Sequence, residues 1–192
     1  MSLKTASEYI ESMRKLKLNL YLLGEKVENR VNNPIIRPST NAVAMTYKLA
    51  HEAESEELAT TNSMLTGKKV NRFNALFKST EDMVKKVKLL RRLGQRTACC
   101  FQRCVGMDGI NAVFSTSYEI DQRYGTEYHQ RFRKWLEFVQ ENDLCIQGAM
   151  TDAKGHRGMA PSKQVDPDMF VHVVERRSDG IVVRGAKASQ TG

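Results

Sequence analysis

Three of the four cysteines of this chain lie within six consecutive positions. They belong to residues 97–104, Thr-Ala-Cys-Cys-Phe-Gln-Arg-Cys, which follow a basic segment of helical periodicity. If that helix continues through them, Cys100 and Cys104 are four residues apart and share one face. Two thiolates so placed can hold a metal or a cluster, and two small apolar side chains so placed can equally face a core. The residues alone leave both interpretations open.

Local start signals predict the helices that position this stretch. The Thr5–Glu8 spacing is that of a capping box and predicts a first amphipathic helix. Ser39 or Thr40 is expected to cap a second helix that ends near Glu54. Residues 79–82, Ser-Thr-Glu-Asp, predict the start of the helix that leads to the cysteines, because acidic residues favour a helix N-terminus.

The remaining helical part is less regular. Residues 58–77 mix polar and glycine-containing pieces with short apolar ones, which suggests a hairpin or an irregular excursion. The glycines in residues 106–109 predict a break after the cysteines. Residues 112–139 then indicate one or two long helices with Trp135 in the core, and residues 142–143 are expected to end the helical part.

From Leu144 onward, short apolar pieces replace long periodic segments. Residues 169–175 and 181–184 read as two strands joined by a turn at 177–180. A lone hairpin is marginally stable, so this portion is expected to need more strands than the chain supplies, and the sequence looks like the front of a longer one. The prediction is an α+β fold, with a mainly helical domain over residues 1–143 and the first part of an antiparallel β domain over residues 144–192.

Composition is that of an ordinary water-soluble protein, with 41% hydrophobic and 27% charged residues in 192 positions. The sequence has no apolar run of membrane-spanning length and no secretory signal, so we expect a cytosolic location and no membrane partner. The clustered cysteines do not have the spacing of a disulfide framework. In a reducing compartment they indicate a metal site, a redox site or simple burial.

The net charge of +8 is concentrated in one segment. Its six cations fall on about three helical turns: Lys85, Lys86, Lys88, Arg91, Arg92 and Arg96. A solvated helix face explains them, as would a site for a phosphate-bearing small molecule. Nucleic acid is not the expected partner, because the sequence has no stacking platform or glycine-rich phosphate loop.

Residues 147–157, 166–168 and 179–187 resemble the flavin-binding part of the 4-hydroxyphenylacetate 3-hydroxylase superfamily. With the cysteine stretch, they are most similar to the branch that dehydrates 4-hydroxybutyryl-CoA to crotonyl-CoA and isomerises vinylacetyl-CoA in 4-aminobutyrate fermentation. The resemblance covers the whole chain. It implies an acyl-CoA-dehydrogenase-like fold whose C-terminal helical domain is absent from the chain, an acyl-CoA substrate, FAD, a [4Fe-4S] cluster and a homotetramer.

The resemblance also assigns residues. Cys100 and Cys104 match two cluster ligands, Gln102 matches an active-site glutamine, and Thr191 matches a threonine that hydrogen-bonds the flavin. In the family the remaining cysteine and histidine ligands follow residue 192, and none of the four histidines here falls at a matching position. The residues implied to contact FAD are Met150, Thr151, Asp152, Lys154, Gly155, His156, Arg157, Ser189, Gln190 and Thr191.

The sequence departs from the family pattern at one position, and both the site residues and the function have alternative interpretations. Relatives usually have Asp where this chain has His156, and Lys154 and Arg157, candidate partners of the FAD phosphates, could also be solvated loop charges. The implied activity is that of a lyase with isomerase activity, using flavin electron transfer and a Lewis-acidic cluster iron. The chain alone is expected to be inactive. The alternatives are a flavin-dependent 4-hydroxyphenylacetate hydroxylase, which does not use the cysteine pair, and a non-enzymatic basic helical protein.

Overall fold

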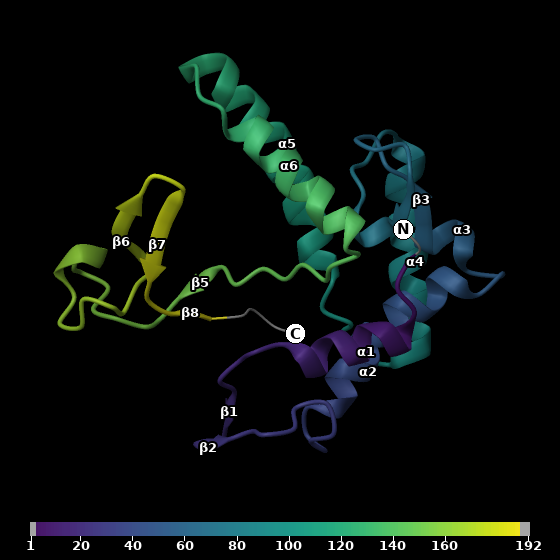
Figure 1. Ribbon diagram of the computed structural model, residues 1–192, viewed down its shortest axis with the longest axis horizontal. Coiled ribbons are helices and arrows are strands. Elements are labelled where there is room, and N and C mark those ends of the chain that lie inside the picture. The colour runs from purple at the N-terminus through teal and green to yellow at the C-terminus, as the bar shows by residue number, and fades with distance from the viewer. Residues whose placement is uncertain (1–2, 189–192) are drawn as a thin grey trace. The chain divides into compact units, whose positions relative to one another are not determined.

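The computed structural model describes residues 3–188. It divides into two units, Met1–Gln147 and Gly148–Gly192 (Figure 1). Across residues 3–188, no helix combines the length and the apolar character that crossing a membrane requires. The cysteines and their surroundings all belong to the first unit.

The first unit is mainly helical, with two small hairpins inserted. Its helices are α1 (Ala6–Lys15), α2 (Arg37–Lys48), η1 (Leu49–His51), α3 (Glu56–Ala59), η2 (Arg72–Asn74), α4 (Thr80–Thr97), α5 (Cys104–Tyr124) and α6 (Tyr128–Glu141). The antiparallel hairpins are β1 (Tyr21–Leu22) with β2 (Glu25–Lys26), and β3 (Thr60–Asn62) with β4 (Lys69–Asn71). The hairpin expected within residues 58–77 is confirmed.

Two of the three expected helix starts are confirmed. The Thr5 hydroxyl accepts the Glu8 N–H at 3.2 Å while the Glu8 carboxylate accepts the Thr5 N–H at 2.7 Å, which completes the capping box. At the start of α4, the Ser79 hydroxyl accepts the Asp82 N–H at 3.4 Å. The expected cap at Ser39 or Thr40 is wrong, because α2 already begins at Arg37 with a proline in its first turn, where the missing N–H costs nothing.

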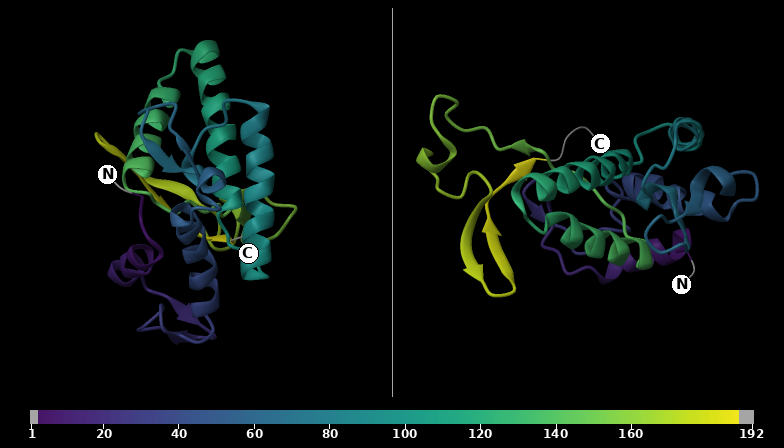
Figure 2. Two further views of the ribbon diagram at one scale, coloured as in Figure 1. Left: turned by 90° about the vertical axis from the view of Figure 1, so that its right-hand side faces the viewer. Right: turned by 90° about the horizontal axis from the view of Figure 1, so that it is seen from above.

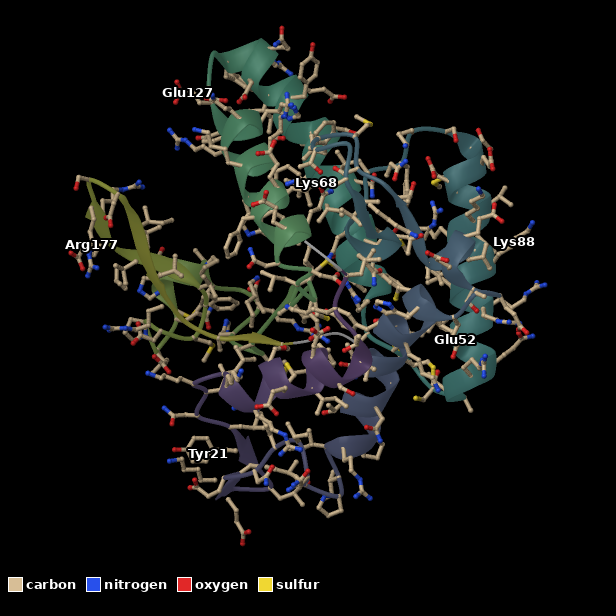
Figure 3. The ribbon with its side chains drawn as sticks, turned by 45° about the vertical axis from the view of Figure 1, so that its right-hand side comes forward. Tyr21, Glu52, Lys68, Lys88, Glu127 and Arg177 are labelled. Atoms are coloured by element: carbon tan, nitrogen blue, oxygen red, sulfur yellow. The ribbon has the colours of Figure 1, made fainter. Side chains whose placement is uncertain are left out.

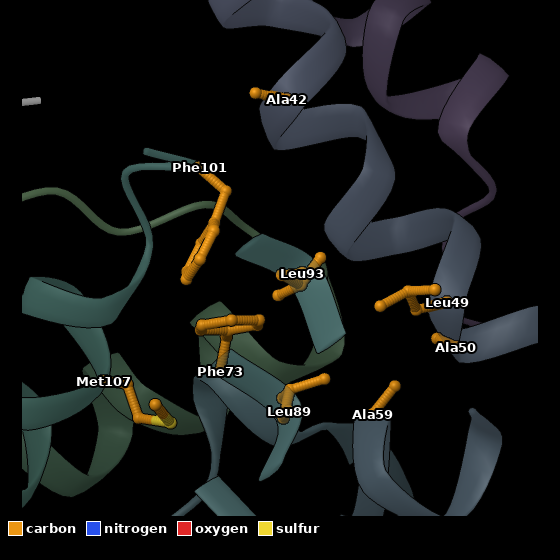
Figure 4. Packing of buried hydrophobic residues seen from close by; sticks show 9 residues of the cluster. All are labelled: Ala42, Leu49, Ala50, Ala59, Phe73, Leu89, Leu93, Phe101 and Met107. Carbon is orange, nitrogen blue, oxygen red and sulfur yellow. The ribbon is translucent and has the colours of Figure 1, made fainter. Parts of the chain in front are cut away.

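The largest core cluster joins α2, α4 and the start of α5 (Figure 4). Its buried members are Ala42, Leu49, Ala50, Ala59, Phe73, Leu89, Leu93, Phe101 and Met107. Phe101 belongs to the cysteine stretch and lies against Phe73, with ring centroids 5.8 Å apart. The core therefore reaches directly into the connection between α4 and α5.

Helices α5 and α6 form an antiparallel pair that lies side by side in both views of Figure 2. Gly125, with a φ of +63°, ends α5 in the left-handed conformation that favours glycine. Leu136 and Val139 are buried between the two helices, but Trp135 remains 43% exposed. The expectation that Trp135 is a core residue is therefore wrong, because its position on α6 lies outside the buried stripe.

The second unit consists of short antiparallel pairs. β6 (His172–Arg177) pairs with β7 (Gly180–Arg184), which confirms the expected hairpin and turn, and β5 (Thr151–Asp152) pairs with β8 (Lys187–Ala188). A 3₁₀ turn, η3 (Pro161–Lys163), lies between them. None of residues 148–188 is buried, so this unit has no core of its own within the described part of the chain.

Candidate functional site

The three clustered cysteines lie in the connection between α4 and α5 and at its end. α4 stops at Thr97 because Ala98 adopts a left-handed backbone with a φ of +51°. Cys99 and Cys100 follow in the connection, and Cys104 is the first residue of α5. The expectation that one helix carries Cys100 and Cys104 on a single face is therefore wrong. We call residues 98–104 the cysteine segment.

Burial alternates along the cysteine segment. Phe101 and Arg103 are buried, whereas Cys100 is exposed and Cys104 is half-buried against the core. The exposure of Cys100 excludes the interpretation that both thiols of the pair are core side chains. The backbone N–H of Gln102 donates to the Cys100 sulfur at 3.4 Å, an interaction that stabilises thiolate ligands in iron–sulfur proteins.

The segment after α6 packs against the cysteine segment within the same unit. The Gln147 amide Nε2 donates to Gln102 Oε1 at 2.9 Å. At the start of α5, a Cβ on Gly106 would lie 2.3 Å from the carbonyl oxygen of Ile146. Residues 106–109 therefore do not break the helix as expected: α5 runs through them, and Gly106 allows the close approach of a second backbone.

Arg103 and Asp143 are buried charges that the sequence did not single out as site residues. The Arg103 guanidinium lies 3.9 Å from the Asp143 carboxylate, and both side chains are almost fully buried. Burial raises the pKa of the Asp143 carboxyl above its usual value, while the Arg103 charge and the Lys4 backbone N–H oppose that increase. Because 40 residues separate the pair along the chain, no local pattern announces it.

The six cations of α4 do not form one basic face. Four pair with carboxylates of other elements: Lys85 with Glu57, Lys86 with Asp108, Arg92 with Glu54, and Arg96 with Glu52. Lys88 and Arg91 instead border a shallow hollow with three apolar residues of α4, and Lys88 extends outward from the helix in Figure 3. Among residues 3–188, Lys88 and Arg91 are the two cations of this set that form no ion pair.

The expected FAD-contacting residues lie in the second unit and are mostly exposed. Thr151 and Asp152 form β5, and Met150 precedes it. Lys154, Gly155, His156 and Arg157 follow in a loop that Gln164 fastens: its side chain accepts the His156 N–H at 2.9 Å and donates to the His156 carbonyl at 3.0 Å. The positions 189, 190 and 191, expected to contact flavin, lie outside the described residues.

These residues fit part of each expected cofactor site. Within residues 3–188, no group of three or more His, Cys, Asp or Glu side chains is placed to bind a metal. Cys100 and Cys104 can therefore supply two of the four thiolate or imidazole ligands of a [4Fe-4S] cluster, and the N-terminus of α5 favours negative charge at Cys104. The exposed cations Lys154 and Arg157 suit the pyrophosphate of FAD.

Comparisons with known proteins place this arrangement in context. The family model described as the N-terminal part of 4-hydroxyphenylacetate 3-hydroxylase matches residues 5–192. The chain is 63% identical over 190 residues to the 4-hydroxybutyryl-CoA dehydratase/vinylacetyl-CoA-Delta-isomerase of Clostridium aminobutyricum, covering 99% of the chain and 39% of that protein. It is 31% identical to the oxygenase component of 4-hydroxyphenylacetate 3-monooxygenase of Thermus thermophilus, covering 98% of the chain and 38% of that protein.

Solved structures give the same result. The oxygen-tolerant archaeal 4-hydroxybutyryl-CoA dehydratase of N. maritimus matches with a TM-score of 0.90 and 49% identity over 97% of the chain and 37% of that structure. A 4-hydroxyphenylacetate 3-monooxygenase oxygenase component complexed with FAD and 4-hydroxyphenylacetate matches with a TM-score of 0.73 and 28% identity over 96% of the chain and 38% of that structure. The chain thus spans less than two-fifths of the length of these relatives, and the acyl-CoA-dehydrogenase-like fold class is confirmed.

Proposed function

This chain belongs to the 4-hydroxyphenylacetate 3-hydroxylase family, and from that premise we propose that it is part of a 4-hydroxybutyryl-CoA dehydratase with vinylacetyl-CoA delta-isomerase activity. The observation that carries the proposal is the arrangement of the cysteine segment. The supporting features are an exposed Cys100 whose sulfur accepts an N–H, a half-buried Cys104 at a helix N-terminus, and Gln102 between them in sequence, and in this proposal they form half of a cluster site. An aromatic hydroxylase has no use for such a half-site.

In this proposal Cys100 and Cys104 hold two irons of a [4Fe-4S] cluster, and the second unit binds FAD. When bound, these groups would supply a Lewis-acidic iron for the departing hydroxide and one-electron transfer to and from the substrate. The Gln102 carbonyl already accepts a hydrogen bond from Gln147, so the Gln102 NH₂ group is the part left to donate to substrate oxygen. In this proposal the hydrogen bond from Gln147 favours the Gln102 orientation whose NH₂ group is free to donate to the substrate.

The FAD site is proposed from residues 150–157 together with positions 189–191. Pairing of β5 with β8 brings Thr151 opposite Ala188, immediately before those positions. Lys187 supports the pairing, because its ammonium donates to the Met150 carbonyl at 3.3 Å and forms an ion pair with Asp152. The exposed Lys154 and Arg157 would hold the FAD phosphates, and the threonine at position 191 would hydrogen-bond the flavin.

The test uses the protein expressed from its complete coding sequence and purified without oxygen. We expect a brown protein with about four irons and four sulfides per chain, as the cluster stoichiometry requires. Cys100→Ala and Cys104→Ala should lose the cluster and the conversion of 4-hydroxybutyryl-CoA to crotonyl-CoA. Cys99→Ala is the matched control, because Cys99 is also an exposed cysteine of the segment and should retain both. Unchanged iron content in Cys104→Ala would show that the ligand assignment is wrong.

Further expectations concern assembly and the isolated chain. We propose that the enzyme is a homotetramer that binds its acyl-CoA substrate in the cytoplasm, and light scattering of the purified protein measures the subunit number. The 192-residue chain expressed by itself should neither hold a complete cluster nor dehydrate 4-hydroxybutyryl-CoA, since no group of three or more possible ligands is placed to bind a metal within residues 3–188. Turnover by that chain would contradict this expectation.

A further inference from the structure

Arg103, whose guanidinium is buried, lies between two residues of the proposed site, Gln102 and Cys104. Arg103 follows Gln102 and precedes Cys104, yet it is only 1% exposed. Its guanidinium carbon lies 4.5 Å from the centre of the Tyr47 ring and 5.0 Å from that of the Phe73 ring, within the range of cation–π attraction. Burying a charge is costly unless it is paired and hydrogen-bonded, so this position requires an explanation.

The Arg103 side chain connects three parts of the first unit to the cysteine segment. Nη1 donates to the Thr46 hydroxyl of α2 at 2.9 Å. Nη2 donates to the Asn74 side chain of η2 at 3.4 Å and to the Leu144 carbonyl at 3.3 Å. Asp143 provides the opposite charge at 3.9 Å. A planar fork with several donors suits this geometry, and a lysine ammonium does not.

The backbone around Arg103 is held in unfavourable conformations. Of the four non-glycine residues with a positive φ in the described part of the chain, Ala98 and Gln102 lie in the cysteine segment, and Asp143 is the partner of Arg103. Such conformations persist only where the surroundings over-determine them. Gln102 lies between two buried residues, Phe101 and Arg103, which hold its backbone in the left-handed conformation. Figure 4 shows Phe101 beside Phe73 in the core.

We propose that Arg103 is a positioning residue whose buried guanidinium fixes the cysteine segment, so that Cys100, Gln102 and Cys104 are presented outside the core in one set geometry. Arg103 contacts neither substrate nor cofactor in this role. It acts through the segment's backbone and through the Leu144 carbonyl, which leads to Gln147 and its hydrogen bond with Gln102. The identity of what the segment binds rests on the proposed function, whereas the positioning itself does not.

The test compares two buried arginines in the protein expressed from its complete coding sequence. Arg103→Lys keeps the charge and removes the planar fork. Arg72→Lys is the matched control, because Arg72 is 3% exposed and its guanidinium binds Asp82 and the carbonyls of Glu57, Leu58 and Thr60, none of them in the cysteine segment. Hydrogen–deuterium exchange of residues 99–104 and iron content are measured on both, and thermal unfolding records the general loss of stability.

We expect Arg103→Lys to speed amide exchange in residues 99–104 at least tenfold and to lower iron content at least twofold. Arg72→Lys should lower the melting temperature but leave exchange and iron at the wild-type level. If Arg103→Lys does not fold, Thr46→Val removes one acceptor of the guanidinium at nearly constant volume and should speed exchange about threefold. Wild-type exchange in a folded Arg103→Lys protein, or in Thr46→Val where the lysine variant does not fold, would overturn the proposal.

The two readouts separate this inference from the proposed function. A wild-type protein without iron would refute the cluster, but faster exchange in Arg103→Lys would still support positioning by Arg103. Iron in the wild type together with equal exchange and equal iron in both lysine variants would support the cluster and reject the role of Arg103.

Discussion

Substituting Gly106 by alanine tests whether the cysteine segment depends on close packing between α5 and residues 144–147. In an open helical position, this change stabilises a protein by about 0.5–1 kcal/mol. Here the new Cβ would lie 2.3 Å from the Ile146 carbonyl oxygen and 2.9 Å from the Ile146 Cβ. Since unstrained carbon contacts need about 3.5 Å, the two backbones must separate by roughly 1 Å.

The magnitude follows from the groups that this separation disturbs. Overpacking of a close contact costs about 1–3 kcal/mol. Two hydrogen bonds involve residues on either side of Ile146: Arg103 donates to the Leu144 carbonyl, and Gln147 donates to Gln102. Weakening them costs up to about 1 kcal/mol each. Set against the gain in helix propensity, the net effect of Gly106→Ala is a loss of about 2 kcal/mol in the free energy of unfolding.

Gly109 provides the matched control. It lies three residues further along α5, and a Cβ there would meet no atom within 4 Å, so Gly109→Ala should stabilise by about 0.5–1 kcal/mol. Urea titrations of the 192-residue chain, followed by far-ultraviolet circular dichroism and by fluorescence of Trp135, its single tryptophan, measure both variants. With a slope of about 2 kcal/mol/M, their midpoints should differ by about 1.5 M. Equal midpoints would refute the close-packing argument.

Two further predictions concern the core and pH. Leu89→Ala, at a position 1% exposed, should destabilise by about 2–5 kcal/mol in urea titrations, whereas Val84→Ala on the same helix, 46% exposed, should change stability by less than about 0.5 kcal/mol. Burial acts to raise the pKa of Asp82, but hydrogen bonds from the Lys78 N–H and from Arg72 outweigh it and lower that pKa. Its stabilising effect is thus present above the unfolded-state pKa near 4 and lost on further acidification, and Asp82→Asn should show a smaller loss of stability between about pH 5 and 2.

The helix starts at Thr5 and Ser79 were predictable because a cap is a local interaction among four residues. The end of α4 was not predictable in the same way. It is made by Ala98, a residue with no preference for the left-handed backbone, whose N–H donates to the Gly94 carbonyl. A helix that continued through Ala98 would have carried the cysteines past the core that Phe101 and Arg103 now enter.

The glycines of α5 show the opposite error. Gly106 and Gly109 suggested a break, since glycine weakens a helix by about 1 kcal/mol relative to alanine. At Gly106 the lower helix propensity is offset by close packing against the backbone of Ile146. Because Ile146 lies 40 positions later in the chain, no local sequence pattern predicts this contact. The candidate residues of the cysteine segment were thus identifiable from residue types and family resemblance, but the geometry that presents them depends on the pairing of residues 98–106 with residues 143–147.

The conformation of the cysteine segment combines left-handed residues with buried side chains. Left-handed backbone at Ala98 and Gln102 costs about 1–2 kcal/mol per residue. Burial of Phe101 contributes about 2–3 kcal/mol, which is of the same size as this cost. The hydrogen bonds of Arg103 act against the cost of burying its own charge. The connection leaves Cys100 exposed and Gln102 half-buried beside Cys104, which is the arrangement that the proposed cluster site requires.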